Sequence, residues 1–300
     1  MPTRVRGSES RCHGLRARLW IAVAAVPILG GCSFARQMAE SSVSYYSWDH
    51  FTLVATVPAK FGFTSKAHYY PKAGESCLKY SPGLGGMVTR EQQMSNNTVA
   101  KNVAQTVSTK IPLEFHIADC SMELGGVIYE VNATYGPDAW DHGLAVAGGL
   151  SVSEAPPSVV ETPVPDLIEQ RRLCAWMFQI SKSKAKLDEI EKLLSCKAAD
   201  ERWSVSKKKY EKRNPGGSFA RSQLVGKTVK VDFRLSTEEY PSVGDTWLKF
   251  PEGWKPCLGD GLNDPYGFCT KNNRNFRTFK MNKRECTIYP NCVEQGVVHD

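Results

Sequence analysis

Apolar and polar residues alternate at every second position in several segments of this chain, and no other feature of the sequence restricts the fold as strongly. The clearest segment reads Thr-Val-Lys-Val-Asp-Phe-Arg-Leu at 228–235, and similar alternation occurs at 51–57, 111–117 and 127–134. A strand with one buried and one wetted face repeats with this period. Because turn-forming clusters of Gly, Pro, Asn and Asp separate the segments, we predict a mainly β fold of antiparallel sheets, arranged as a sandwich or barrel.

Two segments show the spacing of a short helix instead. Residues 98–107 carry valines four positions apart. Residues 184–196 place four apolar residues on one stripe with charged residues elsewhere, namely Leu187, Ile190, Leu193 and Leu194. Apolar residues three or four positions apart share one face of a helix. The sequence therefore predicts one or two short helices that pack on the sheets.

A proline-rich stretch at 154–166 has little periodicity and marks the predicted domain boundary. It separates a predicted β-rich domain at 46–153 from a second one at 167–300, which holds a short helix and the cysteine-rich end of the chain. Proline-rich linkers with few contacts are typical of such boundaries. We therefore expect two small domains, each crosslinked by disulfides.

Residues 1–31 combine five arginines with an apolar run at 19–29. A basic region, a short apolar run and small residues are the parts of a secretory signal, and the run is about half of the ~20 residues that a membrane-spanning helix needs. The residues Leu29-Gly30-Gly31-Cys32 resemble the lipobox of bacterial lipoproteins. The resemblance implies cleavage before Cys32, acyl chains on this cysteine, and the lipid bilayer as a partner. Residues 32–45 are then expected to be a tether.

The residue after the cysteine bears on location. It is Ser33 rather than Asp, which by resemblance to Gram-negative lipoproteins implies the outer membrane, with the protein facing the periplasm. Removing the signal also changes the charge: the 38 basic and 31 acidic residues lose five arginines and one glutamate, which leaves 33 against 30. A formal charge of +3 gives no reason to expect nucleic-acid binding.

The cysteines agree with an exported protein. Of ten, Cys12 leaves with the signal and Cys32 is expected to be acylated, so eight remain. An even number in an oxidising compartment indicates four disulfides. We predict pairs that are local in sequence: Cys77–Cys120, Cys174–Cys196, Cys257–Cys269 and Cys286–Cys292. The alternative for the last four is a nested arrangement, Cys257–Cys292 around Cys269–Cys286. No metal site is predicted, because no CxxC is present and the eight remaining cysteines include a single close cysteine–histidine pair, His116 with Cys120.

One group of polar residues qualifies as a candidate reactive site. Glu114 and His116 alternate onto one face of a predicted strand, and a loop with Asp138, Asp141 and His142 can approach them. Such groups bind divalent metals or act as acid and base. An exposed strand face carries the same residue types without any function, and no GxSxG or HExxH motif is present. We therefore assign no catalytic residue, metal or cofactor.

A basic tract at 271–284 is the conspicuous charge feature of the C-terminal region. Basic residues there, including Arg274, Arg277, Lys280 and Lys283, alternate with aromatic ones. Cations beside aromatic rings can hold an anionic envelope polymer. The alternative is a solvated edge strand whose lysines discourage pairing with other chains.

These observations together predict a lipid-anchored protein of the cell envelope that acts as a binding or structural module. This class includes an inhibitor or immunity-like protein that captures an envelope protein. The alternative function is a periplasmic hydrolase that uses the polar cluster of His116, Asp138 and His142. Convergence of these side chains in one cleft would favour the hydrolase.

Overall fold

The computed structural model describes residues 43–154, 164–183, 187–205, 217–260, 264, 266–269 and 275–293. These residues form mostly β-strands, and the predicted mainly β fold is confirmed. Within these ranges the helical element is one short helix, α2 (Arg221–Leu224), and no helix has the length and apolar character to cross a bilayer. The signal, the lipobox with Cys32, most of the tether and most of the proline-rich segment lie outside the described residues.

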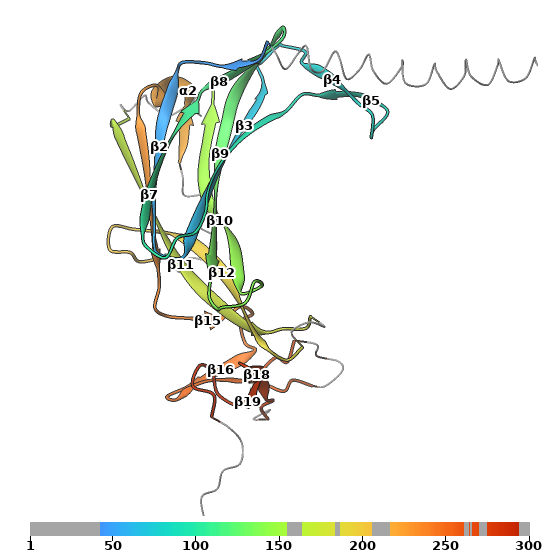
Figure 1. Cartoon of the computed structure of the whole chain (residues 1–300), viewed down its shortest axis with the longest axis vertical. Helices are drawn as coiled ribbons and strands as arrows, with labels where there is room; N and C mark the ends of the chain where they lie inside the picture. The colour runs from blue at the N-terminus through green and yellow to red at the C-terminus, as the bar shows by residue number, and fades with distance from the viewer. Residues whose placement is uncertain are drawn as a thin grey trace, which may run out of the picture.

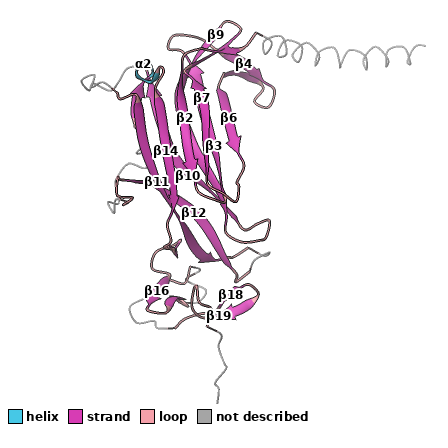
Figure 2. Cartoon of the chain, turned by 60° about the vertical axis from the view of Figure 1, so that its left-hand side comes forward, coloured by secondary structure: helices cyan, strands magenta, loops and turns pink. Residues whose placement is uncertain are grey.

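Two sheets lie face to face as a sandwich (Figure 2). Sheet A contains seven strands of the described chain: β1 (Tyr45–Tyr46), β3 (Phe61–Pro71), β6 (Gln92–Thr98), β8 (Glu114–Ile117), β9 (Cys120–Thr134), β10 (His142–Ser153) and β13 (Ser218–Ala220). Sheet B contains six: β2 (His50–Val57), β7 (Gln105–Pro112), β11 (Leu167–Ile180), β12 (Ile190–Ala199), β14 (Thr228–Leu235) and β15 (Tyr240–Pro241). The long strand β9 is the centre of sheet A, with β3 on one side and both β8 and β10 on the other.

The main core lies between the inner faces of the two sheets. Alternate residues of β2, namely Phe51, Leu53, Ala55 and Val57, are buried there, and Val229, Val231 and Phe233 of β14 join them. The side chains between them are less buried. The period-two segments at 51–57, 127–134 and 228–235 therefore form strands with one face in the core, as predicted, whereas the segment at 111–117 is divided at Leu113 between β7 of sheet B and β8 of sheet A.

Most strand pairs are antiparallel, as predicted, but some neighbours run parallel. In sheet B, β14 runs parallel to both of its neighbours, β11 and β2. Alternation identifies a strand but does not give its direction, and parallel neighbours need long crossover connections. The pairing of β2 with β14 also joins segments that we placed in separate domains, so the sheets do not divide at the proline-rich segment as predicted.

Both predicted helices are wrong. Residues 98–107 run from the last residue of β6 through a loop into β7, and 184–196 end inside β12. Valine is β-branched and favours an extended backbone, and Gln105 holds the loop by donating from Nε2 to the Val99 carbonyl at 2.9 Å. In β12, the neighbours Leu193 and Leu194 lie on opposite faces, one exposed and one buried, as in any strand.

A second, smaller core lies beyond one end of the sandwich, at the bottom of Figure 1, and is formed largely by the C-terminal hairpins. These hairpins are β16 (Trp247–Phe250) with β17 (Gly253–Pro256), and β18 (Phe279–Met281) with β19 (Arg284–Cys286). Phe178 of β11 belongs to this core and lies 5.0 Å from Trp247 and 4.2 Å from Tyr289, measured between ring centroids. Trp176, two residues earlier, belongs to the main core. Strand β11 therefore passes from one core into the other.

The four predicted local disulfides are all present, and the nested alternative is wrong. Sulfur–sulfur bonds join Cys77 with Cys120, Cys174 with Cys196, Cys257 with Cys269, and Cys286 with Cys292. The second bridge links directly opposite residues of β11 and β12. The first fixes the base of a separate hairpin, β4 (Leu78–Ser81) with β5 (Gly86–Thr89), to the start of β9.

Candidate functional site

A cleft opens between the two sheets where their edge strands β6 and β7 face each other. Neither strand continues into the other sheet, because β6 pairs with β3 and β7 pairs with β2. The cleft has a volume of about 330 Å³. Its lining, none of it charged, consists of Leu53, Phe63, Ser65, Ser95, Asn96, Asn97, Thr98, Val107, Ser108 and Thr109.

The floor of the cleft leads into a row of polar side chains that crosses sheet A. Asn96 of β6 lies opposite Ser65 of β3, and Ser65 lies opposite Tyr129 of β9. Residues opposite one another on neighbouring strands point to the same face, which here is the inner face. The Nδ2 of Asn96, the Oγ of Ser65 and the hydroxyl of Tyr129 are all buried without a hydrogen-bond partner. Native interiors leave few such groups unpaired, so three in one row mark this part of the core as unusual.

The row ends at a glycine that makes room for an arginine of the other sheet. Gly148 of β10 lies opposite Tyr129, at an irregularity in the pairing. It has φ +109°, and a Cβ placed there would lie 2.9 Å from both Nε and Nη2 of Arg172. Glycine is required here on both counts, since other residues rarely adopt this φ. The guanidinium of Arg172, on β11, therefore lies against the backbone of sheet A.

Arg172 is a buried cation that is held by neutral acceptors. Its Nε donates to the Ala147 carbonyl at 2.7 Å, Nη2 to Oε1 of Gln170 at 3.1 Å, and Nη1 to the Arg171 carbonyl at 3.3 Å. No carboxylate of the described residues forms an ion pair with Arg172. Burial lowers the pKa of Arg172, and burial raises the pKa of Tyr129 while the charge of Arg172 opposes that rise. Both shifts have the same cause, the low dielectric of the sandwich interior.

The predicted polar cluster is split between the two ends of sheet A. His116 lies opposite Ser121 near the start of β9, whereas His142 lies opposite Thr134 at its end. At ~3.3 Å per residue these positions are roughly 40 Å apart. Asp138 and Asp141 belong to the loop beside His142, where the Asp138 N–H donates to Asp141 Oδ2 at 3.3 Å. The five residues therefore form two local groups.

One of these groups includes a residue that the sequence reasoning missed. The Oγ of Ser121 lies 3.0 Å from Nδ1 of His116, whose Nε2 lies 3.3 Å from a carboxylate oxygen of Glu114. A serine, a histidine and a carboxylate in series are the parts of a nucleophilic site. However, the Ser121 N–H, which would face a developing oxyanion, donates to Glu75 Oε2 at 2.7 Å. These residues line neither the cleft between β6 and β7 nor a second cleft near the C-terminal end of the chain, which is described below.

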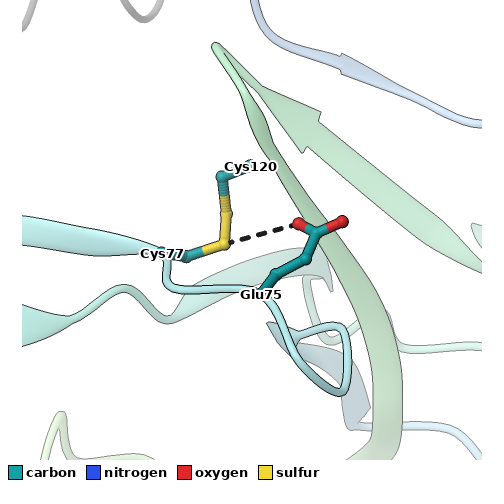
Figure 3. Close-up of side chains that lie close together, drawn as sticks. All are labelled: Glu75, Cys77 and Cys120. Atoms are coloured by element: carbon teal, nitrogen blue, oxygen red, sulfur yellow. Dashed lines mark hydrogen bonds between the residues drawn. A yellow bond between two sulfur atoms is a disulfide. The ribbon is translucent and has the colours of Figure 1, made fainter.

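Glu75, Cys77 and Cys120 are three residues of metal-binding types whose ligand atoms lie within 4.8 Å of one another (Figure 3). The two sulfurs are bonded to each other, and a carboxylate oxygen of Glu75 lies 3.9 Å from the Cys77 sulfur. Metals bind thiolates rather than disulfide sulfurs. In this oxidised form the group is a crosslink and not a metal site.

The structure describes three of the four predicted members of the basic tract. Arg274 lies outside the described residues, while Lys280 and Lys283 are exposed on the β18–β19 hairpin. Arg277 lines a second cleft of about 280 Å³ between the end of β11 and the C-terminal hairpins. Its Nε is buried without a partner, and burial lowers its pKa. In the same cleft Lys182 lies 4.3 Å from the ring centroid of Tyr266.

Comparison of the chain with models of protein families, with curated proteins and with solved structures finds no match.

The row of Asn96, Ser65 and Tyr129 was not predicted from the sequence. One signal was available: in β3 the inward positions read Phe61, Phe63, Ser65, Ala67 and Tyr69, with a serine where an apolar residue is expected.

Proposed function

We propose that this protein is a lipid-anchored binding protein of the cell envelope, and that the cleft between β6 and β7 holds its ligand. The observation that carries the binding role is the row of buried polar atoms without partners at the cleft floor. A buried polar group without a partner costs ~1–3 kcal/mol. A ligand that hydrogen-bonds to Asn96 and Ser65 would recover that cost.

The lining indicates the chemical class of the ligand. Because no charged side chain lines the cleft, a charged ligand would lose its hydration without compensation. Hydroxyl and amide groups supply both donors and acceptors, and Phe63, Leu53 and Val107 supply an apolar wall. A volume of about 330 Å³ is at the small end of ligand pockets. This combination suits an uncharged, hydroxylated molecule the size of a single sugar ring.

The anchor is supported by the sequence rather than by the fold. Leu29-Gly30-Gly31-Cys32 resembles a lipobox, and four disulfides agree with an oxidising compartment. Acylation of Cys32 with two or more chains would hold the protein stably on a membrane. We place it on the outer membrane, facing the periplasm, because Ser33 follows the cysteine.

Binding is tested on the lipidated full-length protein in detergent by saturation-transfer difference NMR. The probes are glucose, N-acetylglucosamine and the charged analogue glucuronate. We expect signals from the neutral sugars with the wild type and with the control Gln93→Leu, which changes an exposed position on the same strand. Asn96→Leu should abolish them. Absence of neutral-sugar signals from the wild type, or unchanged signals from Asn96→Leu, would contradict the proposed ligand class.

The hydrolase remains the second candidate, and the contacts of Ser121, His116 and Glu114 are the observation in its favour. The binding role is preferred because the cleft offers both space and polar atoms that lack partners. The group of Ser121, His116 and Glu114 is half-buried and lines neither cleft, and the backbone N–H of Ser121 already donates to Glu75.

A further inference from the structure

The hairpin of β4 and β5 is an element outside both sheets of the sandwich. It forms its own two-stranded sheet and projects from one end of the molecule (Figure 1). Its base is fixed by the Cys77–Cys120 disulfide and by a hydrogen bond of 2.8 Å from the Arg90 N–H to the Cys77 carbonyl. The hairpin is therefore held firmly at its base while its strands extend away from the core.

The hairpin exposes apolar side chains that the core does not use. Tyr80 lies opposite Met87, and Leu78 precedes Tyr80 by two positions, so these three share one face. Tyr80 is 59% exposed, Met87 58%, and Leu84 at the tip 78%. Several adjacent exposed apolar residues indicate an interaction surface, whereas single ones are common on any protein. Lys79, which is also exposed, points to the opposite face of the hairpin.

The hairpin lies at the end of the molecule where the described chain begins. β1, which starts at Tyr45, pairs with β8, and Ile117 of β8 lies opposite Cys120, the residue to which the hairpin base is crosslinked. The exposed Trp48 belongs to the loop that follows β1. Cys32 precedes Val43 by 11 residues, which span at most ~40 Å. A lipid on Cys32 would therefore hold this end of the molecule, rather than the end with the C-terminal hairpins, close to the bilayer.

From this placement we propose that the β4–β5 hairpin inserts its apolar face into the membrane that the lipidated amino terminus holds. The proposal rests on the lipid anchor of the proposed function. Leu84, Met87 and Tyr80 enter the interfacial region of the bilayer, a position that suits the amphipathic ring of Tyr80. The contact gives the anchored protein a fixed orientation, with the C-terminal hairpins directed away from the membrane.

The test uses the lipidated full chain in vesicles of phosphatidylethanolamine and phosphatidylglycerol, with the environment-sensitive dye NBD on a single introduced cysteine. One variant is Leu84→Cys. The control is Leu144→Cys, which is 65% exposed on the outer face of β10. Flotation of the vesicles reports the anchor, and quenching by brominated lipid reports insertion.

We expect both variants to float. The dye at position 84 should shift to shorter wavelength and lose most of its fluorescence to brominated lipid, whereas the dye at 144 should do neither. Adding Met87→Ser and Tyr80→Ser should remove the quenching at 84 without affecting flotation. Flotation with an unquenched dye at 84 would overturn the hairpin contact alone and would indicate a protein partner for this surface. Failure to float would overturn the anchor and, with it, the hairpin contact.

Discussion

Replacing Ser65 by alanine should stabilise the protein, which is the opposite of the usual effect of a mutation in a core. Ser65 is fully buried and its Oγ has no hydrogen-bond partner. Removing an unpaired buried hydroxyl recovers part of a desolvation cost of ~1–3 kcal/mol, and the loss of one oxygen atom leaves little empty space. We expect the free energy of unfolding to rise by about 1 kcal/mol without ligand, which corresponds to about 2–4 °C in the melting temperature for a chain of this size.

The assay is urea unfolding of the oxidised protein, followed by the fluorescence of its tryptophans. Ser95→Ala is the matched control, because this serine lies at the exposed mouth of the same cleft and should change stability by less than ~0.5 kcal/mol. Tyr129→Phe should shift stability in the same direction as Ser65→Ala, since its hydroxyl is equally unpaired. The reasoning is refuted if Ser65→Ala lowers stability by about 1 kcal/mol or more, because the hydroxyl would then have a partner.

The remaining predictions concern the backbone, the crosslinks, the serine group and the anchor. Gly148→Ala should lower the free energy of unfolding by roughly 2–3 kcal/mol, because residue 148 has a positive φ and its new Cβ would contact Arg172. Gly86→Ala is the control: its new Cβ would have no neighbouring atom within 4 Å, so the midpoint of urea unfolding should change little. Replacing a cysteine pair by alanine should lower the free energy of unfolding by about 4 kcal/mol for Cys77–Cys120 and by about 2 kcal/mol for Cys286–Cys292, because the closed loops span 43 and 6 residues. Equal losses of stability for the two pairs would contradict the loop-entropy argument. A fluorophosphonate probe should leave Ser121 unlabelled in mass spectra, and labelling that Ser121→Ala removes would establish the hydrolase. Cys32→Ser should leave an unprocessed precursor without radiolabelled fatty acid; equal incorporation into wild type and variant would exclude the lipid anchor.

The sequence predicts strands well where alternation is strong, and poorly where it is not. The segments at 127–134 and 228–235 each lie within one strand, because each needs one buried face, whereas 111–117 is divided at Leu113 between two strands of different sheets. The spacing of leucines and isoleucine in 184–196 also fits a helix, and only the pairing of β12 with β11 decides for the strand. Local sequence does not contain that tertiary contact, because the partner strand supplies it.

The candidate site depends on register, which the sequence does not give. Asn96, Ser65 and Tyr129 come from three strands that are distant in the chain, and they meet because each lies opposite the next. Shifting one strand by a single residue would turn its side chains to the other face. Glu114 and His116, in contrast, are close in sequence and do contact each other. The distant members of that predicted cluster do not join them, because the length of β9 separates the two groups.

The parallel pairing of β2 with β14 has a consequence for when the protein can fold. Thr52 lies opposite Thr228, a separation of 176 residues along the chain. Contacts between such distant residues slow folding, because a long loop must close before they form. During synthesis β2 emerges early and has to wait for β14, so the first half of sheet B remains incomplete until most of the chain exists. For the exported protein that we propose, this delay would be useful, since an unfolded chain is what a secretion channel can thread.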